Sequence, residues 1–347
     1  MAPLSVSIQD LRWADVACQE LEDTEAQMTT VRYFSLGRFA MKQALVACGV
    51  GENDSVMLPS FICRDVLAAI NELGAIATFY DVDKKLEPIG LDSAPKSKAI
   101  IAVNYFGFPQ NLEPFKKYCT SYGAKIIEDN AHGFLSRDTN NQLLGQRTEH
   151  GITSFRKSVR TSDGAILTTS HNDTEIAPQL EFQNSAVSFR DSALSLFAQI
   201  ERKTNIPVLN LAQSAVKKVR QLKTGSAMPQ VDSSVEKVIP GMPNPNRSSV
   251  TKMLAVNETN EVARRRNLYN AILADIVKLG LQPVFSTLES GTCPYGFPVY
   301  AAHDSQKQLA KLARKHRVTL MTWPDLPISV LPTAPDYYKQ IWLLNFL

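Results

Sequence analysis

The chain has 347 residues, 44% of them hydrophobic and 20% charged, a composition that excludes a disordered, collagen-like or disulfide-stapled protein. The length is sufficient for two domains with sizeable cores. Because 37 basic and 34 acidic residues leave a net charge of only +3, we expect neither nucleic acid nor an anionic membrane as a partner.

The five cysteines lie far apart, and no Cys/His cluster has the spacing of metal ligands. We therefore expect reduced thiols and no metal. The N-terminal segment is interrupted by acidic residues, and no uncharged apolar stretch approaches the ~20 residues of a membrane span. A cytoplasmic protein is expected.

Between residues 31 and 170, short β-branched apolar runs alternate with stretches of helical period, which is typical of a parallel sheet with helices on its faces. Helices are predicted at 39–48, 64–73 and 112–122, each followed by a glycine that suits a left-handed C-terminal cap. Strands are predicted at 55–59, 75–82, 98–106, 125–129, 152–155 and 165–169. We therefore predict that this half of the chain forms consecutive βαβ units.

After residue 172 a longer helical stretch extends to residue 223, and residues 224–248 are rich in Gly, Pro, Ser and Asn. A helix over 257–280, a strand near 296–300, a helix over 305–315 and a strand over 318–323 follow. We therefore predict a large α/β domain at 1–223, a linker or crossover segment at 224–248 and a small α+β domain at 249–347.

The segment KIIEDNAHGF, residues 125–134, carries acidic groups at the end of a predicted strand and a histidine in the next turn. Open α/β sheets bind ligands at this edge, so Asp129 and His132 are candidate site residues. The alternative is equally favoured by spacing alone: Asp129 would cap the turn, and His132 would be a surface loop residue.

Lys157 follows a predicted strand, lies between Arg156 and Arg160, and precedes a turn into another strand. Nearby cations and partial burial both lower the pKa of an amine, as a lysine that forms a Schiff base near neutrality requires. A solvated basic loop is the alternative, and by itself this segment favours the loop.

The segment RYFSLGRFAMKQAL, residues 32–45, joins a turn to a predicted helix. Helix-start N–H groups with Gly37 and Arg38 are suited to a phosphate, although Ser35 could equally be an ordinary N-cap. The glycines at 49–51 precede a strand, with Asp54 in place of the third glycine of G-x-G-x-x-G, and no Walker A motif is present. Dinucleotide-binding dehydrogenases and P-loop enzymes are therefore disfavoured.

The order of a helix-start anion site, a strand-end aspartate and a later lysine resembles that of fold-type I pyridoxal-phosphate (PLP) enzymes. More narrowly, the chain resembles the DegT/DnrJ/EryC1/StrS family of sugar aminotransferases. The segments that carry the resemblance are GRFAMKQAL, GVGENDSVMLPSFIC, GAIATFYDVD, KAIIAVNYFGFP, EDNAH and SFRKSVRTSDGAIL, with fainter matches at RRRNLYNAIL, CPYGFPVY and MTWPDLP. The resemblance implies the PLP-dependent transferase fold type I, with a mostly parallel central sheet.

The resemblance makes Lys157 the Schiff-base lysine and Asp129 the partner of the pyridine nitrogen. A carboxylate at that nitrogen favours the protonated ring, which can accept the electrons of a broken Cα–H bond. The freed Lys157 amine would then act as general base. His132 would lie near the ring or its phenolic oxygen.

Ser154 and the backbone of Gly37 and Arg38 would hold the cofactor phosphate. Two positions depart from the family pattern. Only Arg156 separates Phe155 from Lys157, where relatives commonly have several residues, and Cys63 stands where many members have an aromatic residue that packs on the ring.

The function implied by the resemblance is amino transfer from an amino acid such as glutamate to a nucleotide-linked keto sugar, by a homodimer. Two alternatives stay open. One is a lyase or dehydratase with the same cofactor, although the sugar dehydratase branch has histidine in place of this lysine. The other is a non-catalytic binding protein that retains the fold.

Overall fold

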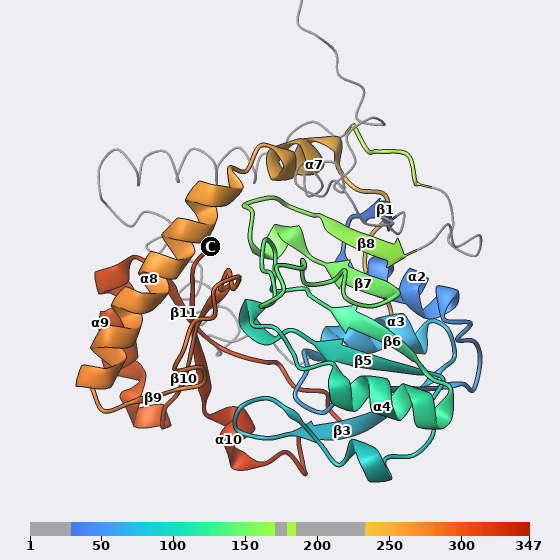
Figure 1. Ribbon diagram of the computed structural model, residues 1–347, viewed down its shortest axis with the longest axis horizontal. Helices are drawn as coiled ribbons and strands as arrows, with labels where there is room; N and C mark the ends of the chain where they lie inside the picture. The colour runs from blue at the N-terminus through green and yellow to red at the C-terminus, as the bar shows by residue number, and fades with distance from the viewer. Residues whose placement is uncertain (1–28, 171–178, 185–232) are drawn as a thin grey trace, which may run out of the picture.

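The computed structural model describes residues 29–170, 179–184 and 233–347 (Figure 1). The helical stretch predicted up to residue 223 lies outside the described residues, except for 179–184, which form no helix. The predicted linker is described only from residue 233 onward. The domain boundaries at 223 and 249 stay a prediction.

An eight-stranded sheet forms the larger part, with the order β1-β8-β7-β6-β5-β2-β3-β4. Neighbouring strands from β3 to β7 are parallel, whereas the pairs that include β8 or β4 are antiparallel. The expected mostly parallel sheet is therefore confirmed. The strands are β1 (Thr29–Phe34), β2 (Ser55–Pro59), β3 (Ile76–Val82), β4 (Pro88–Ile89), β5 (Ala99–Val103), β6 (Lys125–Asp129), β7 (His150–Thr153) and β8 (Ala165–Ser170).

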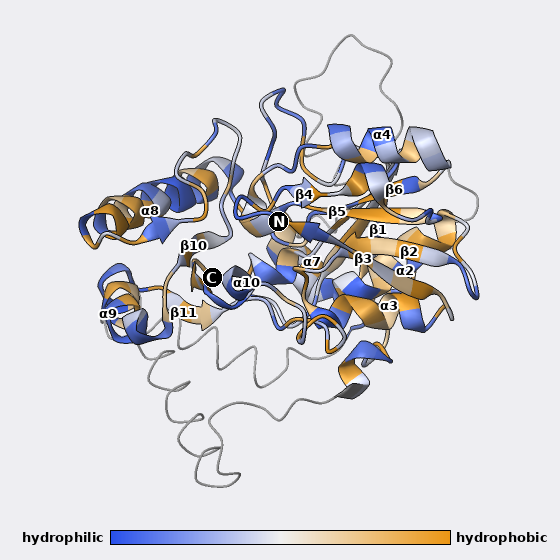
Figure 2. Ribbon diagram, turned by 90° about the horizontal axis from the view of Figure 1, so that it is seen from below, coloured by the Kyte–Doolittle hydropathy of each residue, from blue (hydrophilic) through white to orange (hydrophobic). Residues whose placement is uncertain are grey.

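Helices cover both faces of this sheet, which explains why β5 is apolar at every position and wholly buried. Figure 2 shows α4 (Glu113–Tyr122) on one side and α3 (Leu67–Asn71) on the other. The first helix, α2 (Gly37–Ala47), turns Ala40, Met41 and Ala44 toward the sheet and contacts β7 and β8. Its early start at Gly37 places the helix N-terminus beside the ends of those strands.

Two predicted elements have different bounds in the structure. The helix predicted at 64–73 is divided into a 3-10 turn, Arg64–Val66, and α3. The strand predicted at 98–106 ends at Val103, because Phe106 has a left-handed backbone with φ of 56°, which a strand excludes.

A four-stranded antiparallel sheet, of order β11-β12-β10-β9, forms the smaller part. Its strands are β9 (Gln282–Pro283), β10 (Gly296–Tyr300), β11 (Thr319–Thr322) and β12 (Ile341–Asn345). Helix α7 (Arg247–Leu254) packs with Tyr33 of β1 and Ile166 of β8 of the large sheet. It is followed in the sequence by α8 (Glu258–Lys278), α9 (Gln306–His316) and α10 (Asp336–Lys339). Both α8 and α9 pack on the four-stranded sheet. Within the described ranges, no helix is long and apolar enough to span a membrane.

One cluster of buried apolar side chains continues from the large sheet into the small one. Phe61, after β2, contacts Trp323 and Tyr338, with ring centroids 5.1 and 4.8 Å away. Tyr338 also donates or accepts a hydrogen bond with the Ser60 hydroxyl at 2.9 Å. The two sheets therefore share a core beside the strand ends where ligands of α/β proteins bind.

Candidate active site

All seven residues predicted for the site line one cavity at the carboxyl ends of the central strands. They are Gly37, Arg38, Cys63, Asp129, His132, Ser154 and Lys157. Asp129 ends β6, and Ser154 directly follows β7. Distant parts of the sequence therefore meet at this cavity, which is formed by strand ends, the 3-10 turn after β7 and the start of α2. The roles of these residues stay a prediction.

Lys157 is held in the 3-10 turn Phe155–Lys157, where its backbone N–H donates to the Ser154 carbonyl at 3.0 Å. The residue is partly accessible through the cavity, but its amine is enclosed by protein. Burial lowers the pKa of this amine, and the charge of Arg156 acts in the same direction, while Cys63 and Asp129 oppose them. The alternative of a solvated basic loop is therefore wrong for Lys157, and burial shifts its amine in the direction that a nucleophile requires.

Asp129 is 4% exposed, and its Oδ1 accepts the Ala131 N–H at 2.9 Å. This bond is the turn interaction that spacing alone suggested, so the carboxylate both shapes the turn and lines the cavity. Burial raises its pKa, whereas the Lys157 charge and the Ala131 N–H lower it. A cationic partner in the cavity would favour the ionised carboxylate.

His132 is 4% exposed, so the surface-loop alternative is wrong for it. Its ring is stacked with Tyr295, at 4.5 Å and 2°, and with Phe106, at 5.8 Å and 12°. Its Nε2 lies 3.3 Å from Lys157 Nζ. Burial, and secondarily the Lys157 charge, hold the pKa of His132 well below its usual value.

This histidine should make stability depend on pH in the cofactor-free protein. Below about pH 6.5 the unfolded chain protonates His132 while the folded protein does not. The free energy of unfolding should therefore decrease as the pH is lowered, by up to about 1.4 kcal/mol per pH unit. Urea unfolding from pH 7.5 to 5 measures this slope. His132→Gln should have a shallower slope than the wild type, and identical slopes would contradict the neutral buried imidazole.

Cys63 precedes the 3-10 turn Arg64–Val66. Burial raises the pKa of its thiol, and the nearby Asp65 acts in the same direction. The thiol is therefore neutral at physiological pH. The Cys63 side chain is therefore a small, uncharged part of the cavity lining, and a ring could lie against it.

The start of α2 has unsatisfied N–H groups, because its N-cap is Leu36, whose side chain caps nothing. The Ser35 hydroxyl donates to the Met242 carbonyl, so the alternative of an ordinary serine N-cap is wrong. A Cβ added at Gly37 would lie 3.6 Å from Ser154 Cβ. The short spacing before Lys157 therefore still places Ser154 against this helix start.

Sequence reasoning missed several residues that also line the cavity, including Asn104, Asp65 and Trp323, and it gave Arg156 only an electrostatic role. Trp323 follows β11 in the small sheet and packs edge-on against His132, with centroids 5.2 Å apart and planes at 68°. The position of Arg156 next to Lys157 in the sequence could have identified Arg156 as a cavity residue. The sequence around Trp323 contains no comparable signal.

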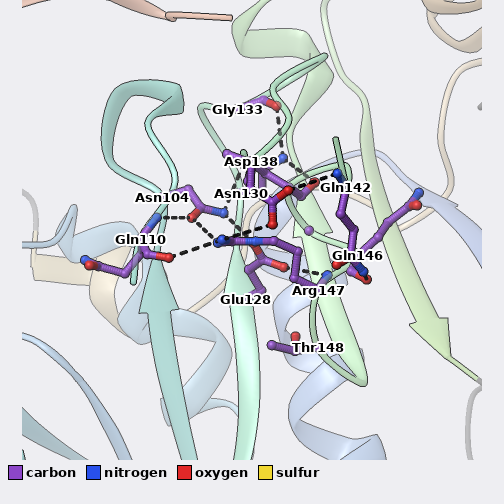
Figure 3. Close-up of polar contacts among 12 residues, drawn as sticks. Asn104, Gln110, Glu128, Asn130, Gly133, Asp138, Gln142, Gln146, Arg147 and Thr148 are labelled. Atoms are coloured by element: carbon purple, nitrogen blue, oxygen red, sulfur yellow. Dashed lines mark hydrogen bonds and ion pairs between the residues drawn. The ribbon is translucent and has the colours of Figure 1, made fainter. Parts of the chain in front are cut away.

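Glu128, the neighbour of Asp129 in β6, belongs to a buried polar network centred on Arg147 (Figure 3). Glu128 is fully buried, and its Oε1 lies 2.8 Å from Arg147 Nε and 2.7 Å from Arg147 Nη2. Arg147 also donates to the Asn104 side chain at 2.9 Å and to the Gln110 carbonyl at 3.2 Å. The charge of Glu128 is therefore compensated within the fold.

Asn104 connects this network to the cavity. Its side chain donates to Glu128 Oε1 at 2.8 Å, its backbone N–H donates to the Asp129 carbonyl at 2.9 Å, and it lines the cavity itself. The network thus holds the ends of β5 and β6 in register. We infer that it fixes the position of the Asp129 carboxylate.

A sequence model of the DegT/DnrJ/EryC1/StrS aminotransferase family matches residues 26–199. The chain belongs to this family. Membership confirms the expected fold class, PLP as the cofactor and an enzyme of the PLP-dependent aminotransferase type.

Solved structures of DegT/DnrJ/EryC1/StrS aminotransferases are similar to this chain. The aminotransferase TlmJ from Streptoalloteichus hindustanus is 18% identical, with a TM-score of 0.59 over 91% of this chain and 80% of its own. DesV from S. venezuelae, solved with a ketimine intermediate, is 16% identical, with a TM-score of 0.60 over 91% and 79%. PseC from Helicobacter pylori, an aminotransferase of pseudoaminic acid biosynthesis, is 14% identical, with a TM-score of 0.59 over 95% and 84%. These likenesses support the fold.

The residues of the cavity fit the cofactor of the DegT/DnrJ/EryC1/StrS family. Lys157 supplies an amine with a lowered pKa, and Asp129 supplies a buried carboxylate. Ser154 is 2% exposed, and its hydroxyl makes no hydrogen bond with the described residues. A hydroxyl that lines the cavity beside a helix N-terminus is suited to a phosphate oxygen.

Proposed function

We propose that the chain transfers an amino group from an amino acid, with glutamate as the first donor to test, to a nucleotide-linked keto sugar. The observation that carries the proposal is that Lys157, in the 3-10 turn after β7, and Asp129, at the end of β6, line one cavity. Among similar structures, DesI was solved with its TDP-sugar product, and ColD, a GDP-4-keto-6-deoxymannose-3-dehydratase, was solved as a mutant with GDP-perosamine. These ligands support a nucleotide sugar as acceptor.

When bound, PLP supplies an electron sink for the bond that breaks at the substrate Cα. Lys157 would hold the cofactor through its amine and, when that amine is free, would serve as the base that carries the proton of the substrate Cα. The Asp129 carboxylate would favour the protonated ring nitrogen by its negative charge. The edge of neutral His132, 3.3 Å from the Lys157 amine, would accept a hydrogen bond and keep that amine directed into the cavity.

The proposal is tested with purified protein loaded with PLP. Addition of glutamate should convert the visible absorbance of the cofactor to that of its amine form and release one equivalent of 2-oxoglutarate. The amine-loaded protein should then aminate one of a panel of keto-sugar nucleotides, detected by mass. Release of water from the sugar without amine incorporation would indicate the dehydratase alternative, and a protein that cannot be loaded would indicate the binding alternative.

Asp129→Asn should retain part of the PLP affinity but lower the amino-transfer rate by about 10²- to 10³-fold, because the amide cannot hold charge against the ring nitrogen. Stopped-flow absorbance after glutamate addition measures this half-reaction. Asp92→Asn, the same change at an exposed carboxylate outside the cavity, is the matched control and should keep the wild-type rate. A full rate in Asp129→Asn would show that the ring nitrogen has a different partner.

We also propose a homodimer, as the family resemblance implies. Sedimentation should then give twice the 38.4 kDa mass of one chain. A single-chain mass at micromolar concentration would contradict this proposal without affecting the assignment of the cavity.

A further inference from the structure

Two arginine side chains with unsatisfied buried nitrogens line the cavity near the start of α2. Arg156 Nε is buried without a hydrogen-bond partner, and the Arg156 guanidinium forms no ion pair with the described residues. Arg38 Nη1 is also buried without a hydrogen-bond partner. Leaving such donors unsatisfied is costly, so this arrangement indicates a ligand that accepts hydrogen bonds.

The charges of this region also favour an anion. Asp65 is the carboxylate nearest to the pair, but its Oδ2 lies 3.7 Å from Arg38 Nη1, beyond hydrogen-bond distance, and its side chain is 39% exposed. Burial lowers the pKa of Arg156, and the charge of Arg38 acts in the same direction, while Asp65 and Asp163 oppose them. Among the described residues, neither guanidinium has a carboxylate within hydrogen-bond distance, and the helix N-terminus adds to the positive potential.

We propose that the guanidinium groups of Arg156 and Arg38 bind the phosphate of PLP from within the same chain. This inference rests on the proposed function, since it requires PLP in the cavity. Ser154 and the N–H groups at Gly37 would bind the same phosphate, because they lie against each other at the start of α2. Arg156 follows Ser154 by two residues and directly precedes Lys157, so one short segment brings the hydroxyl, the guanidinium and the amine to this cavity.

A phosphate monoester fits these donors better than the carboxylate of an amino-acid donor does. A phosphate has three acceptor oxygens and a charge of about −1.5 to −2 near neutrality. The hydroxyl, the helix start and the two guanidinium groups offer enough donors for three oxygens, and the two guanidinium charges balance the charge of the phosphate. A carboxylate has two oxygens and a single charge. It would leave some of these donors unsatisfied.

The experiment compares two ligands that differ only in the phosphate. Cofactor-free protein is titrated with PLP and with pyridoxal, and the absorbance change gives both dissociation constants. Arg156→Gln should weaken PLP binding by about 10- to 100-fold, the effect of losing a charged hydrogen bond of ~1.5–3 kcal/mol, and leave pyridoxal binding unchanged. Arg156→Lys, which keeps the charge but loses the planar fork, should recover part of the loss. Arg38→Gln should resemble Arg156→Gln, with a smaller loss because Asp65 already offsets part of the Arg38 charge.

Arg160→Gln is the matched control, since Arg160 is an exposed arginine of the same loop that does not line this cavity. It should bind both ligands as the wild type does. Inorganic phosphate gives a second measurement without the vitamin ring. Millimolar phosphate should raise the melting temperature of the cofactor-free wild type, and Arg156→Gln should largely lose this increase.

The outcomes separate this inference from the proposed function. If Arg156→Gln weakens PLP and pyridoxal equally, the arginine acts through the fold and the inference is wrong. If it leaves both affinities unchanged but raises the KM for glutamate, the arginine binds the donor carboxylate and the inference is also wrong. In either case the wild type still binds PLP, whereas wild-type protein that binds neither ligand would overturn the proposed function itself.

Discussion

Lys157→Ala should lower the rate of amino transfer by about 10⁴-fold or more, because one side chain both attaches the cofactor and moves the substrate proton. The variant should keep its fold, since among the described residues the Lys157 amine has no hydrogen-bond partner other than His132. Rates of 2-oxoglutarate formation in matched preparations measure the effect. Circular dichroism and the melting temperature check the fold.

Two further observations make this result specific to the amine. PLP added to Lys157→Ala should not produce the visible absorbance of a Schiff base, and a small primary amine such as methylamine should restore part of the rate. Arg160→Ala, at an exposed position of the same loop, should change neither property. An unchanged absorbance in Lys157→Ala would refute the assignment of this lysine.

Arg147→Met should lower the free energy of unfolding by about 3–5 kcal/mol, because it leaves the fully buried Glu128 carboxylate without its compensating charge. This is a large fraction of the ~5–15 kcal/mol that stabilises a typical protein. Urea unfolding measures the loss. Because the network positions Asp129, the variant protein that stays folded should also react more slowly with glutamate. Its affinity for PLP should change little.

Two controls define the origin of this loss. The double variant Glu128→Gln/Arg147→Met removes both charges and should recover much of the stability. Lys125→Met breaks the exposed pair of Lys125 with Glu149, whose side chains are 51% and 41% exposed, and should cost less than about 1 kcal/mol. A loss of under 1 kcal/mol in Arg147→Met would show that water or another group compensates Glu128.

The sheet was largely predictable because its strands have local signals. Runs such as residues 99–103 are apolar at every position, and β6 and β10 have the predicted bounds. The strand predicted at 152–155 is shifted to β7 because pairing with β6 and β8 decides its register. This register buries His150 to 1% exposure, although an isolated histidine suggests the surface. Strand β12 was missed, since IWLLN has no period that distinguishes a strand from a buried helical turn.

Sequence reasoning identified those residues of the candidate site that lie close together in the sequence. Asp129 and His132 lie on one turn, and Ser154 and Lys157 on another, so the order of these segments was sufficient to select them. The residues that position them come from elsewhere. Neither the stacking of Tyr295 on His132 nor the pairing of Arg147 with Glu128 has a sequence signal, because both depend on contacts between elements far apart in the chain.

The shared core of the two sheets limits how substrates can enter. A hinge that swung the sheets apart would pull Trp323 and Tyr338 away from Phe61 and expose these rings to water. An aromatic side chain buries about 150–250 Å², and each Å² returned to water costs about 25 cal/mol. Wide rigid-body opening would therefore cost several kcal/mol in each catalytic cycle. Small shifts of the loops around the mouth of the cavity are the cheaper route by which donor and acceptor can exchange.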